Sequence, residues 1–184
     1  MITENICNVW HVAGNNKNSY AVKLAEPLIK NNYGKEVCLV EYAYPFTSDD
    51  GDANGNSVAG GIPTEGYISS VQSQSALIRD MNEFALREGA IGTFYWGGVW
   101  IPVGSDRTAN EALWEKYGSG WASSYASGYD PEVKGNYGGS SWDNQALFGF
   151  DGKALPSLAT FRYLRYGTNT VDGVDYIPDP VMTV

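Results

Sequence analysis

The sequence predicts an α/β fold with parallel strands. Two apolar runs of strand length, at residues 37–43 and 90–96, flank a segment with the periodicity of an amphipathic helix. A crossover of this length joins parallel strands by a right-handed connection. A glycine-rich polar segment follows each run. Because ligands bind at the carboxyl ends of parallel strands, any functional site is expected at that edge of the sheet.

The first third of the chain is predicted to hold a short strand and a helix. Residues 5–12 are the candidate strand, and a loop signal at residues 14–18 ends it. Apolar side chains at residues 20–29 have helical spacing, although Pro27 should kink or restart that helix.

The run 37–43 predicts a buried strand that carries a single carboxylate, Glu41, near its carboxyl end. A carboxylate in the body of a buried strand is costly when it is unpaired, whereas the mouth of a strand is open to a ligand. Glu41 is therefore a candidate catalytic residue, and the alternative is an ion-paired glutamate at a strand end.

Oxygen-bearing side chains alternate directly after this strand, at Asp50, Asp52, Asn54 and Asn56. These are hard donors of the kind that Ca²⁺ takes at about 2.3–2.6 Å. No glutamate closes the loop at the twelfth position, so the pattern departs from an EF-hand. An ordinary turn is the alternative, because Asp, Asn and Gly are common in turns.

The crossover helix is predicted to begin at Ser69-x-x-Gln72, a capping-box pattern, and to end before Gly89, a candidate C′ residue. Its buried stripe is predicted to comprise Leu77, Ile78, Met81, Phe84 and Ala85.

Residues 97–150 are predicted to form a long functional loop, because they are rich in Gly, Ser and aromatic residues. A last helix should begin at Pro156 and end at Gly167, with an inner stripe of Leu158, Phe161 and Leu164. Residues 1–167 are thus predicted to form part of a single domain, and residues 168–184 to be an extended tail or linker.

Composition excludes several classes of protein. The chain has 12 basic and 21 acidic residues, a net charge of −9, which argues against nucleic-acid binding. No apolar stretch approaches the length of about 18 residues that a membrane span needs, and no signal peptide is visible after Met1. The two cysteines, Cys7 and Cys38, predict neither a disulfide framework nor a Cys-based zinc site.

Four motifs resemble, in order, glycoside hydrolase family 53, the endo-β-1,4-galactanases that act on arabinogalactan. They are EYAYPFT at 41–47, TFYW at 93–96, ALWEKYGSGWA at 112–122 and SSWDNQALF at 140–148. The resemblance implies the C-terminal part of a (β/α)8 TIM barrel, its last strands and helices. A complete barrel usually takes about 250 residues. We therefore expect an incomplete barrel, with the N-terminal half of the barrel as its partner.

By this resemblance, Glu41 is the nucleophile of a retaining glycosidase, in which two carboxyl groups lie about 5–5.5 Å apart. The acid/base glutamate of the family follows an asparagine at the end of the fourth strand. The Asn-Glu pairs at 82–83 and 110–111 do not follow a predicted strand. We therefore assign no acid/base residue and expect the chain alone to be inactive.

Three tryptophans are candidate substrate-binding residues. Trp96 ends the second strand, where related retaining barrels place the floor of the −1 subsite, and a core tryptophan is the alternative. Trp121 and Trp142 are further candidates that could instead brace the long loop. Gly97 and Gly98 stand where the family has an acidic residue after this tryptophan.

The resemblance also implies a structural calcium ion. In bacterial members of the family, the loop after the nucleophile strand is completed by a distant Ser-x-x-Asp, which Ser140 and Asp143 match. The implied ligands are Asp50, Asp52, Asn54, Asn56, Ser140 and Asp143.

The function implied is endo-cleavage of β-1,4-galactan in arabinogalactan and pectin side chains, at an extracellular location. Another retaining β-glycanase of the same barrel group is one alternative, and its products from glucan and galactan would distinguish it. A non-catalytic, calcium-stabilised galactan-binding fragment is the other alternative, and it would bind galactan without turnover.

Overall fold

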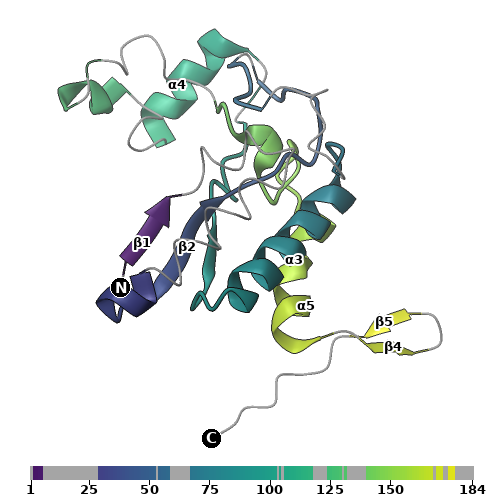
Figure 1. Ribbon diagram of the computed structural model, residues 1–184. Helices are drawn as coiled ribbons and strands as arrows, with labels where there is room; N and C mark the ends of the chain where they lie inside the picture. The colour runs from purple at the N-terminus through teal and green to yellow at the C-terminus, as the bar shows by residue number, and fades with distance from the viewer. Residues whose placement is uncertain are drawn as a thin grey trace, which may run out of the picture.

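The computed structural model describes residues 2–5, 29–52, 54–58, 67–102, 104, 106–117, 124–129, 131, 140–167, 169–171 and 174–176. Its centre is a parallel sheet with the strand order β1-β2-β3 (Figure 1). The strands are β1 (Ile2–Asn5), β2 (Val37–Tyr42) and β3 (Thr93–Tyr95). Helix α3 (Val71–Arg87) connects β2 to β3, so the predicted parallel β-α-β order is confirmed.

β1 covers Ile2–Asn5 and pairs in parallel with β2. Of the strand predicted at 5–12, the structure describes only Asn5, which is the last residue of β1. Residues 6–12 lie outside the described residues. A strand of four residues at a sheet edge has a weak local pattern, because pairing with its neighbour contributes more than intrinsic propensity. Most of the helix predicted at 20–29 also lies outside the described residues, although residues 29–33 are helical.

Helix α3 begins one residue later than the capping-box pattern predicts. Ser70, not Ser69, is the N-cap, because its backbone is extended and its side chain accepts a hydrogen bond from the N–H of Ser73 at 3.0 Å. Gly89 follows the C-cap with a φ of 93°, which confirms it as the C′ residue. The predicted stripe packs inward as expected, and Gln74 joins it as a buried residue.

The core lies between the sheet and the helices α3 and α5 (Thr160–Tyr166), which lie side by side (Figure 1). Leu39 and Tyr42 of β2 pack there against Leu77 and Ile78 of α3. Burying such side chains stabilises each by about 1.5–3 kcal/mol. The sheet is therefore held at one face, which leaves its carboxyl edge to the loops.

The segment 97–150 is not only a loop. It contains helix α4 (Arg107–Tyr117) and short 3-10 turns at Ser124–Gly128 and Asp143–Gln145. Asp106 caps α4, because its Oδ1 accepts a hydrogen bond from the N–H of Ala109 at 2.7 Å. The helix was missed because its glycine- and serine-rich surroundings dominate the local composition.

The last helix has a different inner face from the one predicted. A 3-10 turn (Pro156–Ala159) precedes α5, and Gly167 ends the helix as expected. Leu158 and Leu164 are 36 % and 39 % exposed, so their assignment to an inner stripe was wrong. The 3-10 turn has three residues per turn rather than 3.6, which rotates Ser157 and Thr160 inward instead.

Within the predicted tail 168–184 the structure contains a short antiparallel hairpin of β4 (Asn169–Val171) and β5 (Val174–Tyr176) (Figure 1). The division of the chain at residue 167 stays a prediction. Among the described residues, no helix is both long enough and apolar enough to cross a membrane. Cys38 is buried and free.

Candidate functional site

Glu41 lies one residue before the end of β2, at the carboxyl edge of the sheet, and is half-buried. On one side its backbone lies opposite Asn5 of β1. On the other side Trp96, the residue after β3, donates its backbone N–H to the carbonyl of Tyr42 at 2.8 Å. The strand-end tryptophan and the candidate nucleophile are therefore neighbours across two adjacent strands.

A β-bulge interrupts β2 just before its end. Leu39 pairs with Thr93 and Tyr42 pairs with Tyr95, so three residue steps on β2 lie opposite two steps on β3. The pairing of β2 with β1 shifts at the same place. Bulges are frequent at barrel rims and beside active sites, where they redirect a side chain. This one lets Leu39 and Tyr42 both pack against α3, so strand alternation places Glu41 on the opposite face.

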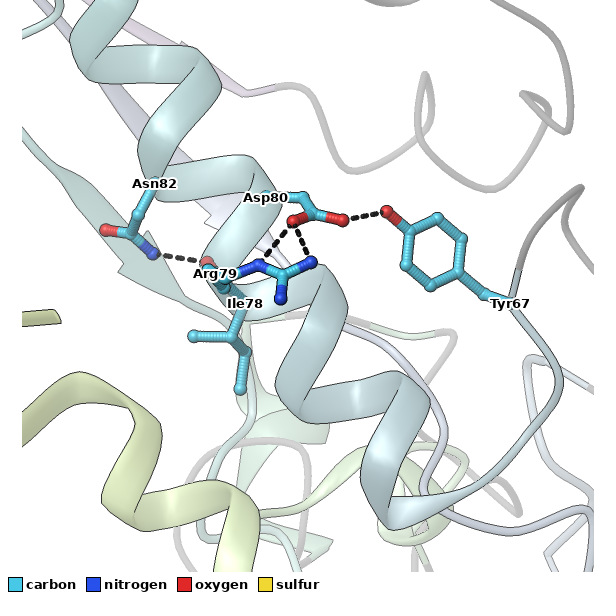
Figure 2. A network of polar contacts seen from close by, with 5 residues as sticks. All are labelled: Tyr67, Ile78, Arg79, Asp80 and Asn82. Carbon is cyan, nitrogen blue, oxygen red and sulfur yellow. Dashed lines mark hydrogen bonds and ion pairs between the residues drawn. The ribbon is translucent and has the colours of Figure 1, made fainter. Parts of the chain in front are cut away.

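The two Asn-Glu pairs lie on helices, and neither directly follows a strand. Asn82 is in α3, where its Nδ2 donates to the Tyr42 hydroxyl and to the Ile78 carbonyl, both at 2.8 Å. Figure 2 shows the contact with Ile78. Asn110 is buried in α4 and donates to the Gly104 carbonyl. Both asparagines make structural hydrogen bonds within the fold. Neither Asn-Glu pair therefore matches the strand-end pair that the family uses as its acid/base.

A second network anchors the chain before α3 to the end of β2. Asp80 accepts a hydrogen bond from the Tyr67 hydroxyl and pairs with Arg79 at 2.7 Å (Figure 2). The Tyr44 hydroxyl donates to the Tyr67 carbonyl at 2.9 Å. Burial and the Asp80 carboxylate raise the pKa of Tyr67, so this hydroxyl stays a donor. The network positions Tyr44, which follows the candidate nucleophile by three residues.

Three tryptophan rings form a continuous aromatic cluster beside this edge. The ring centroids of Trp96 and Trp100 lie 5.4 Å apart, and those of Trp100 and Trp142 lie 6.5 Å apart. Trp100 is 46 % exposed, and sequence reasoning missed it, although the motif TFYW ends only four residues earlier. Trp121 lies outside the described residues. Trp100 is exposed, whereas Trp96 and Trp142 are half-buried, so the cluster keeps some open ring surface of the kind that stacks on sugars.

Gly97 and Gly98 admit the segment 140–147 to the end of β3. A Cβ on Gly97 would lie 3.0 Å from the Trp142 ring, and the φ of Gly97 is 67°, which favours glycine. A Cβ on Gly98 would lie 3.0 Å from Leu147, whose N–H donates to the Gly98 carbonyl at 2.8 Å. The two glycines therefore have a packing role next to Trp96.

Three carboxylates from distant segments meet in one cluster. Asp50, Asp52 and Asp143 each offer an oxygen, and these oxygens lie within 4.8 Å of one another. The backbone N–H groups of Gly51 and Ser140 donate to Asp143 at 3.1 Å and to Asp52 at 2.8 Å. The segments 50–56 and 140–143 are thereby cross-linked, as the calcium prediction requires.

The other predicted ligands lie in the same two segments. Asn54 donates its backbone N–H to Asp52 Oδ1 at 2.7 Å and its Nδ2 to Ser141 Oγ at 3.1 Å. Ser140 Oγ donates to the Trp100 carbonyl at 3.2 Å, and Asn56 Nδ2 donates to the Asp49 carbonyl at 3.0 Å. The contacts bring Asp50, Asp52, Asn54, Ser140 and Asp143 together, and Asn56 lies in the same loop. Their coordination of an ion stays a prediction.

The cluster has the chemistry of a cation site. Asp143 is fully buried, and its Oδ1 has no hydrogen-bond partner among the described residues. Asn56 Oδ1 is also buried, and no donor to it is found in the part of the chain that the structure describes. Burial, together with the carboxylates of Asp52 and Asp50, raises the pKa of Asp143 to about 7. Buried acceptors without donors and crowded carboxylates are stabilised by a hard cation.

Comparisons with known proteins agree with the motifs. Residues 8–161 match the model of Glycosyl hydrolase family 53. The chain belongs to glycoside hydrolase family 53. Endo-beta-1,4-galactanase of Bacillus subtilis (strain 168) is 47 % identical to this family 53 chain over 163 residues, which is 86 % of the chain and 37 % of that protein.

Two further relatives place the family 53 chain in the same way. Arabinogalactan endo-beta-1,4-galactanase of Cellvibrio japonicus (strain Ueda107) is 30 % identical over 108 residues, 59 % of this chain and 27 % of that protein. The GH53 catalytic domain of Ignisphaera aggregans is 30 % identical, with a TM-score of 0.59, over 88 % of this chain and 38 % of that one. The family 53 chain thus spans well under half the length of these relatives, and the predicted fold class, part of a (β/α)8 barrel, is confirmed.

Proposed function

We propose that this chain supplies the nucleophile side of a retaining endo-β-1,4-galactanase. The observation that carries the proposal is the position of Glu41 at the carboxyl edge of β2, behind a bulge and beside Trp96. Two relatives are named for cleavage of β-1,4-galactan or arabinogalactan, which supports galactan as the substrate. The acidic net charge is compatible with a neutral sugar polymer.

In this proposal Glu41 attacks the anomeric carbon of a galactosyl residue and forms a covalent glycosyl–enzyme intermediate. A second carboxyl group protonates the leaving oxygen and then activates the water that releases the product. Glu83 and Glu111 lie on α3 and α4 rather than at a strand end, so in this proposal the N-terminal half of the barrel supplies the proton donor. The rings of Trp96, Trp100 and Trp142 offer apolar faces on which successive sugars stack.

Calcium has a structural role in this proposal. The ligands are the three clustered carboxylates with Asn54, Asn56 and Ser140. A bound Ca²⁺ supplies positive charge to this cluster and takes no part in bond cleavage. The buried Asp143 Oδ1, which has no donor among the residues that the structure describes, supports this assignment. A cation held by these residues would join 50–56 to 140–143, the segment that leads into Trp142.

The location in this proposal is extracellular, with pectin galactan side chains as the natural polymer. Support comes from the size of the substrate, because a pectin galactan chain outside the cell is too large to cross a membrane and must be cleaved first. Two alternatives remain in the test below: a β-glycanase of different specificity, and a galactan-binding fragment without turnover.

The test uses a chimera, because the chain matches only part of each relative. The matched segment of the Bacillus subtilis relative is replaced by this chain, and reducing-sugar release is measured on β-1,4-galactan and on β-glucan. Glu41→Gln should preserve the melting temperature and galactan binding but abolish turnover, since the covalent step needs the carboxylate. Glu36→Gln, an exposed glutamate just before β2, is the matched control and should keep full activity.

Each alternative has its own outcome. If Glu41→Gln retains activity within about tenfold of the parent chimera, a loss of only ~1.4 kcal/mol, then Glu41 is not the nucleophile. Preference for glucan would favour the other β-glycanase. Galactan binding by a folded parent chimera without any product would favour the non-catalytic fragment.

A further inference from the structure

Gln74 is a fully buried polar residue on the inner face of α3, with 0 % exposure. Its Nε2 lies within hydrogen-bond distance of four acceptors: the carbonyls of Tyr44 at 2.9 Å, Ala146 at 3.0 Å and Gln145 at 3.3 Å, and the Tyr95 hydroxyl at 3.1 Å. Its Oε1 accepts a hydrogen bond from the hydroxyl of Ser157. Every polar atom of this side chain is therefore engaged.

The orientation of the Gln74 amide follows from its partners. Ser157 donates its hydroxyl proton to the oxygen end, so the two N–H groups point to the carbonyl-rich end. Tyr95 reinforces the same junction, because its hydroxyl accepts the N–H of Tyr44 at 3.1 Å and donates to the Gln145 carbonyl at 2.9 Å. Neither glutamate nor methionine at position 74 could supply these donors.

The junction joins the two halves of the candidate site. Tyr44 lies three residues after Glu41, and the carbonyls of Gln145 and Ala146 lie two and three residues after Asp143. Asp143 begins the 3-10 turn that Gln145 ends. A single side chain of α3 thus holds the end of the Asp143 turn against the strand that carries Glu41.

We propose that Gln74 is a positioning residue that presets the Asp143 turn for a divalent cation. The inference rests on the proposed cation site. Without these hydrogen bonds, the segment 143–147 would adopt the binding geometry for only part of the time. The apparent dissociation constant for the cation rises in inverse proportion to that populated fraction.

The experiment compares the whole 184-residue chain with Gln74→Met and Ser157→Ala, and with Gln72→Met as the matched control. Position 72 carries the same residue type on the exposed face of the same helix. Calcium affinity is measured by calorimetry after chelation, and melting temperatures are measured in chelator. Gln74→Met should weaken Ca²⁺ binding by about tenfold or more, Ser157→Ala by about threefold or more, and Gln72→Met by less than about twofold.

The readout separates positioning from packing. A packing role alone would lower the melting temperature of Gln74→Met in chelator but leave its Ca²⁺ affinity within about twofold of the parent, which would overturn the inference. If Gln74→Met does not fold, the Ca²⁺ affinity of Ser157→Ala decides: a loss of about threefold or more supports the inference, and a smaller loss overturns it. If the parent chain binds no Ca²⁺, both the cation site and this inference are wrong. If the parent binds Ca²⁺ and Gln74→Met binds it with the same affinity, only the inference is wrong.

Discussion

The Oδ2 atom of Asp143 accepts a hydrogen bond of 3.1 Å from the backbone N–H of Gly51, although the two residues are 92 positions apart in the chain. Asp50 and Asp52 flank this glycine, so the contact brings all three clustered carboxylates together. Changes on either side of it should therefore alter cation binding and the stability of the fold together.

Calcium should raise the melting temperature of the chain. A ligand that binds only the folded state stabilises it by about 2.7 kcal/mol at a hundredfold excess over its dissociation constant. Asp52→Ala and Asp143→Ala should each abolish the response, because both belong to one cluster. Asp49→Ala, an exposed aspartate of the same loop, should keep it. Thermal melts in Ca²⁺ and in chelator measure this, and a parent melt that ignores both would contradict the site.

Gly51→Ala should destabilise the chain and weaken its Ca²⁺ response. A Cβ at this position would lie 2.7 Å from the Phe150 ring and 2.9 Å from Asp143 Oδ2. Overpacking of this kind costs about 1–3 kcal/mol. Gly55→Ala is the control in the same loop, because nothing lies within 4 Å of its added Cβ. Urea unfolding of both variants, with and without Ca²⁺, gives the comparison. Equal urea midpoints for Gly51→Ala and Gly55→Ala would contradict the close packing of Gly51 against Phe150 and Asp143.

In chelator, the contribution of Asp143 to the stability of the chain should fall as the pH rises from about 4 to about 7. The pKa of Asp143 is raised to about 7 in the folded chain, whereas an unfolded aspartate has a pKa of about 3.9. The folded state therefore binds the proton more tightly, and this contribution is complete below the unfolded pKa and is lost as the pH passes the folded pKa. Asp143→Asn should flatten this part of the curve of unfolding free energy against pH. Superimposable curves for parent and variant would refute the shift.

Trp100→Ala should weaken the binding of β-1,4-galacto-oligosaccharides. The Trp100 ring contacts the rings of both Trp96 and Trp142 and is 46 % exposed. Its loss therefore removes a stacking face and leaves the other two rings without the ring that packs between them. We expect about a tenfold loss of affinity, equivalent to ~1.4 kcal/mol. Trp100→Phe should recover part of it. Titration of the chimera with an oligosaccharide measures the change, with the exposed Tyr117→Ala on α4 as control. Unaltered affinity in Trp100→Ala would exclude the cluster from the binding surface.

Local sequence patterns determined the main elements of this fold. The stripe of α3 and its end at Gly89 follow from helical periodicity and a favoured C′ residue. The strand that carries Glu41 and its parallel partner follow from apolar runs separated by a long crossover. Such signals are read from neighbours in the chain, so they need no knowledge of distant contacts.

Tertiary contacts decided what local patterns leave open. The burial of Gln74, the exposure of Leu158 and the aromatic cluster around Trp100 depend on which segments meet. The same holds for the bulge before Glu41, because a strand acquires an extra residue only relative to its partners. Asp143 and Gly51 meet because hydrogen bonds across the fold satisfy polar groups that are buried together. The resemblance to family 53 implied that these two segments meet, but the local sequence around either residue does not specify the other as its partner.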